Sequence, residues 1–213
     1  APNPANPDIV YAGTYKGYMM RKDHAKNQTR SVNVWPVNPA GWGVEVMKYR
    51  FNWNFPVFFS PHEENKLYTG SNYLHVSYDD GHSWEVISPD LTRGNPETLR
   101  SSGGSISQDN TGVEFYGTII CGLESPYKKG LLWTGSDDGL VHVSKDGGKN
   151  WNNVTPKGLP ENAMINDISV NPFVEGGAYM AATAYKFGDY TPYLYKTEDY
   201  GASWQLITQG IPE

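Results

Sequence analysis

The sequence predicts an all-β protein built from repeated four-stranded units, and three observations support this prediction. Gly and Pro account for 23 and 15 of the 213 residues and separate short runs rich in Val, Ile, Tyr and Trp. No stretch keeps the spacing of about 3.6 residues between apolar positions that an amphipathic helix requires over several turns. An octapeptide with the pattern Ser/Thr-x-Asp-x-Gly-x-x-Trp occurs three times, so the chain contains an internal repeat.

The octapeptides are expected to be tight turns between antiparallel strands. In such a turn the Asp carboxylate accepts backbone N–H bonds, the Gly supplies a positive φ, and the Ser or Thr hydroxyl closes the loop. We predict that each Trp packs between neighbouring sheets. The residues that fill these structural positions are Ser77, Asp79, Gly81, Trp84, Ser144, Asp146, Gly148, Trp151, Thr197, Asp199, Gly201 and Trp204.

A calcium loop is the functional alternative for these turns. The segment Asp146-Gly-Gly-Lys-Asn150 carries oxygen ligands at alternate positions. A calcium loop of this kind also needs an acidic residue at about its twelfth position, which is missing here. The other two octapeptides lack the remaining ligands. We therefore predict no metal site and no cofactor.

Strand patterns flank each octapeptide at regular distances. Alternating apolar residues lead into it, and a short strand follows its Trp. Upstream lies a strand marked by an aromatic residue, Tyr68, Trp133 or Tyr179, and a turn containing Pro starts eight residues before that aromatic. An apolar strand precedes each of these turns. The repeating unit therefore has four strands, which is the blade of a β-propeller.

The chain is thus expected to form an incomplete β-propeller over residues 1–213. Full blades are expected at 53–87, 115–154 and 165–207, and a partial blade at 1–36. In the partial blade Asp23 takes the octapeptide Asp position, whereas Ala25 and Gln28 replace the Gly and Trp. Its innermost strand is expected to be missing. Because propellers usually close with about 4 to 8 blades, the expected partner is the remainder of the ring, in the same longer chain or in another subunit.

Composition and charge exclude several functions. The chain has 17 Lys and Arg residues against 23 Asp and Glu residues, a net charge of −6, so it lacks the positive charge typical of nucleic-acid binding. Its apolar runs are far shorter than the roughly 20 residues that cross a bilayer, which predicts no membrane insertion. The single cysteine, Cys121, lies in an apolar strand and favours a buried thiol. His75 and His142 share a repeat position with Tyr195, so we interpret them as strand-packing residues.

Loop length varies at one end of the predicted blades. The connections from the second to the third strand and from one blade to the next emerge at the same end, and their lengths differ between the repeats. Long loops on a rigid scaffold are where binding or catalysis is expected. Candidate catalytic carboxylates at this end are Asp109, Glu114, Asp137 and Asp138, and candidate binding residues are Arg93, Arg100, Tyr185, Asp189, Tyr190 and Trp42.

Aromatic and acidic side chains in these loops suit a sugar or a peptide ligand. The aromatic residues around the first connection between blades are Trp35, Trp42, Tyr49 and Trp53. A glycosidase needs two carboxylates about 5 to 10 Å apart, a distance that sequence does not supply. The alternative is that Asp137-Asp138-Gly139 is ordinary turn chemistry and that the loop charges are solvated.

The octapeptide resembles the Asp-box, or bacterial neuraminidase repeat, of sialidases, xyloglucanases and sortilin-type receptors. More closely, the chain resembles large bacterial proteins labelled glycosyl hydrolase or sortilin-like. Segments that carry this resemblance are spread over essentially the whole chain and include Asn33-Val-Trp-Pro36, Gly41-Trp-Gly43, Phe59-Ser-Pro-His62, Ile87-Ser-Pro-Asp-Leu-Thr92 and Trp133-Thr-Gly-Ser-Asp-Asp-Gly-Leu140. The resemblance implies a secreted or periplasmic protein of greater length with tandem propellers.

Two functions are compatible with these features. The first is a non-catalytic propeller segment that binds a protein or glycan ligand, or acts as an assembly scaffold, in a larger extracytoplasmic protein. The alternative is a glycoside hydrolase propeller, xyloglucanase-like or sialidase-like, with its acidic pair among the loops. No catalytic pair of the xyloglucanases can be placed residue by residue on this stretch, so both alternatives stay open at this point.

Overall fold

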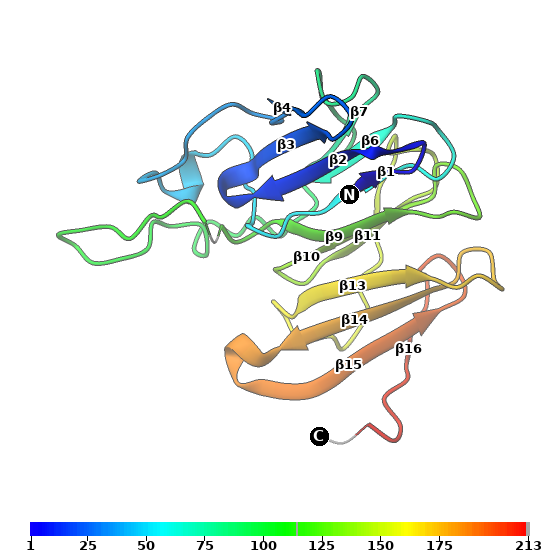
Figure 1. The fold of residues 1–213 in the computed structure, drawn as a ribbon. Helices are drawn as coiled ribbons and strands as arrows, with labels where there is room; N and C mark the ends of the chain where they lie inside the picture. The colour runs from blue at the N-terminus through cyan, green and yellow to red at the C-terminus, as the bar shows by residue number, and fades with distance from the viewer. Residues whose placement is uncertain (114, 212–213) are drawn as a thin grey trace.

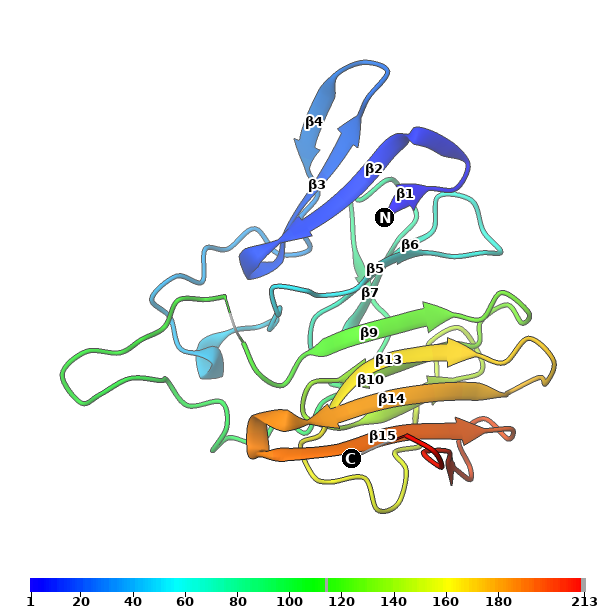
Figure 2. The same cartoon turned by 60° about the horizontal axis from the view of Figure 1, so that its bottom comes forward.

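The computed structural model describes residues 1–113 and 115–211, and their regular secondary structure is β apart from three short 3-10 turns. Sixteen strands form four antiparallel sheets of four strands each (Figures 1 and 2). This arrangement confirms the predicted all-β propeller fold with four-stranded blades. In the described part of the chain, no helix is long and apolar enough to span a membrane.

Each sheet is a simple meander in which consecutive strands are neighbours. The first sheet contains β1 (Pro2–Asn3), β2 (Asn6–Thr14), β3 (Tyr18–Asp23) and β4 (Gln28–Ser31). The second contains β5 (Val57–Phe59), β6 (Leu67–Gly70), β7 (Leu74–Ser77) and β8 (Glu85–Val86). The third contains β9 (Ile119–Glu124), β10 (Leu132–Ser136), β11 (Val141–Ser144) and β12 (Asn152–Asn153). The fourth contains β13 (Met164–Val170), β14 (Ala178–Ala184), β15 (Asp189–Thr197) and β16 (Gln205–Leu206).

The connections gather at two opposite ends of the sheets. Figure 2 shows the 3-10 turns η1 (Tyr15–Gly17) and η3 (Tyr185–Phe187) at the same end as the long green segment that precedes β9. A third 3-10 turn, η2 (Val44–Val46), lies in the connection between the first two sheets. We call the end that carries η1, η3 and the long segment before β9 the loop face. The octapeptide turns join the third and fourth strands of a blade at the other end.

The first blade has an innermost strand, so the expectation that it is missing was wrong. β1 pairs with β2 through Pro2 and Val10. The Ala1 amine donates to the Tyr11 carbonyl at 2.7 Å, and the Tyr11 N–H donates to the Ala1 carbonyl at 2.9 Å. A strand of two residues is too short to show the alternation by which strands are recognised in a sequence.

The strand register also shifts the octapeptide position of the first blade by one residue. Arg21 pairs with Arg30 in this blade as Val76 pairs with Glu85 in the second. Counted from these pairs, the Asp, Gly and Trp positions fall on His24, Lys26 and Thr29, not on Asp23, Ala25 and Gln28. The Asp23 carboxylate instead accepts the backbone N–H of Lys26 at 2.9 Å, closing a different turn.

Apolar side chains between neighbouring sheets form three core clusters. Tyr68 of β6 and Trp133 of β10 are fully buried, and each packs toward the following sheet. Burial of a large apolar side chain contributes roughly 1.5–3 kcal/mol. Each middle sheet is therefore held on both flanks, which fixes the positions of the loops that it carries.

The histidines and the cysteine lie in this packed interior. His75 of β7 and His142 of β11 occupy equivalent register positions, as predicted. Burial lowers the pKa of His75 to about 3 and that of His142 to about 4, so both side chains are neutral at physiological pH. Burial also raises the pKa of the Cys121 thiol, which lies within 3.4 Å of the Ile165 carbonyl oxygen. These features fit packing roles rather than acid–base or nucleophilic chemistry.

Candidate functional site

The three octapeptide turns share one set of hydrogen bonds. The Ser or Thr hydroxyl donates to the Asp carboxylate at 2.8–2.9 Å and accepts the backbone N–H of the Gly at 2.8–3.0 Å. The residue four positions after the Asp, namely Ser83, Asn150 or Ser203, donates two further bonds to the same carboxylate. Each Asp is therefore occupied by donors of its own turn. Among the described residues, no group of three His, Cys, Asp or Glu side chains could hold a metal ion.

A hollow of about 520 Å³ opens on the loop face, and we call it the loop-face cleft. Residues from three separate parts of the chain line it: the connection before β5, the start of the third blade with its β10–β11 turn, and the fourth blade with η3. The lining residues are Asn52, Trp53, Asn54, Phe115, Tyr116, Ile120, Asp137, Met164, Tyr185 and Lys186. The fold thus brings together side chains that lie more than 130 positions apart in the sequence.

Two exposed aromatic side chains stand at this cleft. Trp53 is 53% exposed and stacks on Tyr15 of η1, with ring centroids 6.0 Å apart and planes 11° from parallel. Tyr185 of η3 is 50% exposed. The exposed half of each ring offers apolar surface to a ligand, and the other half packs on the protein, which holds the ring in place.

Asp137 is the acidic side chain of the cleft, and it is buried in the turn between β10 and β11. Its carboxylate accepts the backbone N–H of Thr118 at 2.8 Å and the Thr118 hydroxyl at 3.0 Å. The Asn52 side-chain amide donates a third, longer bond at 3.4 Å. Burial raises the pKa of Asp137 to about 7 despite these bonds. The group can therefore hold or release a proton near neutral pH.

Asp138, the adjacent residue, has a different environment. It is buried, and its carboxylate accepts the Ser136 hydroxyl at 2.6 Å and the backbone N–H of Arg93 at 2.8 Å. The Arg93 guanidinium donates in turn to the Asp138 carbonyl at 2.7 Å. Burial also raises the pKa of Asp138. Asp138 and Arg93 together attach the long segment before β9 to the third blade and do not line the cleft.

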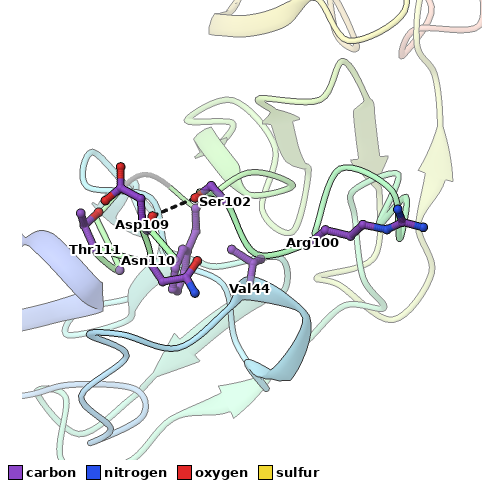
Figure 3. Close-up of a pocket in the computed structure, with 8 residues that line it drawn as sticks. Val44, Arg100, Ser102, Asp109, Asn110 and Thr111 are labelled. Atoms are coloured by element: carbon purple, nitrogen blue, oxygen red, sulfur yellow. Dashed lines mark hydrogen bonds between the residues drawn. The ribbon is translucent and has the colours of Figure 1, made fainter. Parts of the chain in front are cut away.

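The remaining carboxylate and arginine candidates do not converge on the cleft. Asp109 is exposed and lies at a separate hollow of about 170 Å³ (Figure 3). Arg100 also lines this hollow, but Figure 3 shows its guanidinium extending away from Asp109, and it pairs with Glu97. Glu114 lies outside the described residues.

Three further binding candidates, Tyr190, Trp42 and Asp189, do not line the cleft. Tyr190 is 79% exposed, and Trp42 is 59% exposed. Asp189 accepts the Tyr193 hydroxyl at 2.6 Å, which lowers its pKa, so its charge is used within the fourth blade. Of the binding candidates, only Tyr185 lines the cleft.

Sequence patterns did not point to several important polar residues. Arg50 is buried and donates to Asp90 at 2.8 Å, to Thr92 at 2.8 Å and to the Gly117 carbonyl at 2.9 Å. The Asn72 amide joins the same network by donating to Asp90 at 2.8 Å. Asp90 and Thr92 lie in a segment that carries the family resemblance, Ile87-Ser-Pro-Asp-Leu-Thr92, but nothing in the sequence indicates that Arg50 joins them.

Comparison with known proteins finds one curated relative in sequence and several solved structures in fold. No protein-family model matches the chain. An oligoxyloglucan-reducing end-specific xyloglucanase of Emericella nidulans is 26% identical over 164 residues, which cover 71% of this chain and 17% of that protein. The chain thus spans less than a fifth of the length of this curated relative.

Solved structures show the same fold at lower identity. The GH74 xyloglucanase of Xanthomonas campestris superposes with a TM-score of 0.62 at 18% identity, covering 99% of this chain and 30% of that one. An ancestral GH74 enzyme gives a TM-score of 0.56 at 18% identity, covering 94% and 22%. The GH74 enzyme of Niastella koreensis gives 0.53 at 13% identity, covering 96% and 29%. The chain is thus a β-propeller segment that is similar in fold to GH74 xyloglucanases.

Proposed function

We propose that the chain is a glycan-binding, non-catalytic segment of a β-propeller and that the loop-face cleft holds the sugar. The observation that carries this proposal is the combination of two half-exposed aromatic rings with the buried carboxyl group of Asp137 around one hollow of about 520 Å³. Ligand sites typically combine an apolar, aromatic lining with a few well-placed polar groups.

The chemistry of the lining matches a carbohydrate. A sugar ring presents C–H groups on its faces and hydroxyls at its edge, so it can stack on Trp53 or Tyr185 while its hydroxyls bond to Asn52 and Asp137. The Tyr15 ring stacked behind Trp53 restricts the movement of the indole, which reduces the entropy lost when a ligand binds. The names of the similar proteins refer to xyloglucan, which makes its oligosaccharides the first ligands to test.

The proposal of a non-catalytic role rests on the number of carboxylates. Glycoside hydrolysis uses two carboxyl groups about 5 to 10 Å apart on either side of the scissile bond. Among the described residues that line the cleft, Asp137 is the only carboxylate. Asp138 is engaged by Ser136 and Arg93, and Asp109 lies at the other hollow.

Calorimetric titration of the protein with xyloglucan oligosaccharides tests this function. Trp53→Ala should weaken binding about tenfold, because one aromatic stacking contact is worth about 1.4 kcal/mol. Tyr190→Ala is the matched control, since it removes an exposed aromatic residue of the fourth blade that does not line the cleft. Equal affinities of Trp53→Ala, Tyr190→Ala and the wild type would exclude the cleft as the sugar site.

A glycoside hydrolase is the second candidate function, and Asp137 favours it. A buried carboxyl group with a pKa of about 7 is suited to act as a general acid near neutral pH. Its second carboxylate would come from outside the described lining. Turnover of a glycan panel should then be lost in Asp137→Asn and retained in Asp109→Asn; full activity of both variants would remove Asp137 from the reaction.

We further propose that the octapeptides are Asp-box repeats and that the protein acts outside the cytoplasm. The identical turn geometry in three blades supports the first part, and the resemblance to secreted propeller proteins supports the second. Cell fractionation with an antibody against the chain checks the location.

A further inference from the structure

The outer strands of the first blade, β3 and β4, carry two arginines directly opposite each other (Figure 2). Arg21 of β3 pairs with Arg30 of β4 in the strand register. Like charges in opposite positions of a sheet destabilise it. The equivalent pairs in the other three blades contain at most one cation: Val76 and Glu85, Val143 and Asn152, and Lys196 and Gln205. The first blade therefore holds a pair of positive charges that sheet formation alone does not favour.

One carboxylate, from the second blade, lies next to this pair. Asp80, in the octapeptide turn of that blade, lies 3.5 Å from the Arg21 guanidinium. The other oxygen of the same carboxylate accepts the Tyr11 hydroxyl at 3.2 Å. Arg30 donates instead to the Asp80 backbone carbonyl at 2.6 Å, and it forms no ion pair with a carboxylate of residues 1–113 or 115–211. Two guanidinium groups are therefore balanced by one carboxylate, which leaves an excess positive charge.

Both arginines line a hollow of about 260 Å³, which we call the arginine-pair hollow. Its other lining residues are Gln28 and Thr29, whose amide and hydroxyl groups can donate hydrogen bonds. No carboxylate is found among the described lining residues, since Asp80 is not one of them. The Nε–H of Arg21 is buried and has no hydrogen-bond partner in the described part of the chain. A buried N–H without a partner is costly, so an acceptor that reaches this guanidinium would stabilise it.

The chemistry of this lining points to an oxyanion. A guanidinium group donates from a fixed planar fork that matches the oxygens of carboxylate, sulfate or phosphate. One fork satisfies a carboxylate, whereas two forks from neighbouring strands suit a tetrahedral anion, which offers more acceptor oxygens. We propose that the arginine-pair hollow binds a tetrahedral oxyanion, a sulfate or phosphate group carried by a sugar or present as the free ion, between Arg21 and Arg30.

A contact between the first two blades is the other role that this pair could have. That role accounts for Arg21, which lies beside Asp80 of the second blade. It does not account for the charge of Arg30, because a neutral side chain such as Gln could bond to the Asp80 carbonyl without repelling Arg21. The arginine-pair hollow is also separate from the loop-face cleft, since no residue lines both. Its ligand therefore does not depend on whether the cleft binds a glycan.

Calorimetric titration at low ionic strength tests the inference. The probes are inorganic sulfate, inorganic phosphate, glucose 6-sulfate and glucose 6-phosphate, with glucose, glucuronate and sodium chloride as comparisons. We expect Arg30→Gln to weaken oxyanion binding about tenfold, because it removes charge-assisted hydrogen bonds. Arg30→Lys keeps the charge but loses the planar fork, so it should also bind more weakly than the wild type. Binding of the sugar esters without the inorganic ions would identify a sugar as the carrier, and equal binding would identify the free ion.

Two further variants give the experiment a direction and a control. Asp80→Asn should bind the anion several-fold more tightly, because it removes the competing carboxylate, and Asn tolerates the positive φ of 61° at this position. Lys22→Gln is the matched control, since Lys22 is the next residue of β3, bonds to Asn27 and does not line the hollow. Its affinity should equal that of the wild type. Urea unfolding of every variant measures the stability separately from the binding.

Four results would overturn the proposal. The first is a wild type that binds none of the sulfates and phosphates. The second is an equal loss of affinity in Arg30→Gln and Lys22→Gln, which would show general attraction by positive charge. The third is a loss of stability in Arg30→Gln without a loss of affinity, which would leave the pair only a blade contact. The fourth is glucuronate binding as tight as that of glucose 6-sulfate, which would remove the preference for a tetrahedral group.

Discussion

The two ends of the blades use aspartate in opposite ways. At the octapeptide end, Asp79 and Asp146 are exposed to solvent, and donors of their own turns lower their pKa values to about 2. On the loop face, Asp137 is buried and its pKa is raised to about 7. Both kinds of carboxylate accept several hydrogen bonds, so the number of bonds does not explain the difference.

Burial explains it. A carboxylate that keeps contact with water gains from each added donor, whereas a buried one first loses its solvation, and the donors recover only part of that loss. The octapeptide end is therefore a region of fixed charges and identical turns, which favours a structural role. The loop face holds Asp137, and a buried carboxyl group with a raised pKa is typical of functional sites.

The largest expected effect is a loss of stability when Gly148, the glycine of the second octapeptide, is substituted. Gly148→Ala should lower the free energy of unfolding by about 2–4 kcal/mol, because it combines a left-handed backbone with overpacking against Ile87. Gly147→Ala is the control: its φ is also positive, but an added Cβ meets nothing within 4 Å, so it should cost only about 1–2 kcal/mol. Urea unfolding of both variants measures the difference, and equal costs would argue against a close contact between the blades.

An intermediate effect is expected from the protonation of Asp137. Its folded pKa of about 7 lies above the value of about 3.9 for an unfolded chain, so the native state keeps a proton that the unfolded state has released. Stability should therefore fall as the pH rises from about 4 to about 7, by at most about 1.4 kcal/mol per pH unit. Asp137→Asn should flatten this dependence, and the exposed Asp109→Asn should not. Denaturant unfolding at several pH values provides the test. If the free energy of unfolding of Asp137→Asn changes with pH as steeply as that of the wild type, the prediction is wrong.

The smallest effect is expected from Asp79. Its folded pKa is lowered by the bonds from Ser83 and Ser77, so its contribution is present above about pH 4 and is lost as the pH falls toward about 2. Asp79→Asn should reduce the acid sensitivity of unfolding slightly, because an exposed turn contributes little. Thermal melts between pH 2 and pH 5 compare the variant with the wild type, and a loss of stability at pH 7 larger than that of Gly148→Ala would contradict this ranking.

Local patterns were enough to predict the blades. Ser77, Asp79 and Gly81 bond to one another within five residues, so their turn is visible in any copy of the octapeptide. The short strand β1 and the shifted turn of the first blade could not be predicted in this way. Both depend on pairing with β2 or β3 rather than on a local motif.

The site depended on contacts that are distant in sequence. Asp137 receives bonds from Thr118, 19 positions away, and from Asn52, 85 positions away, whereas Asp138 is bonded by Arg93, 45 positions away. Nothing in the sequence Asp137-Asp138-Gly139 distinguishes a cleft residue from an attachment point for a loop. Asn52 and Tyr116 line the cleft for the same reason, because the fold brings distant segments together there.

The amino-acid sequence by itself determined that this protein is a series of four-stranded blades, three of which carry an octapeptide turn between their last two strands, because strand alternation and turn bonding are encoded by neighbouring residues. Only the tertiary structure decided which loops meet at the cleft and which aspartate is buried there. These properties follow from the packing of one blade on the next, and packing unites residues whose order along the chain says nothing about their distance in space.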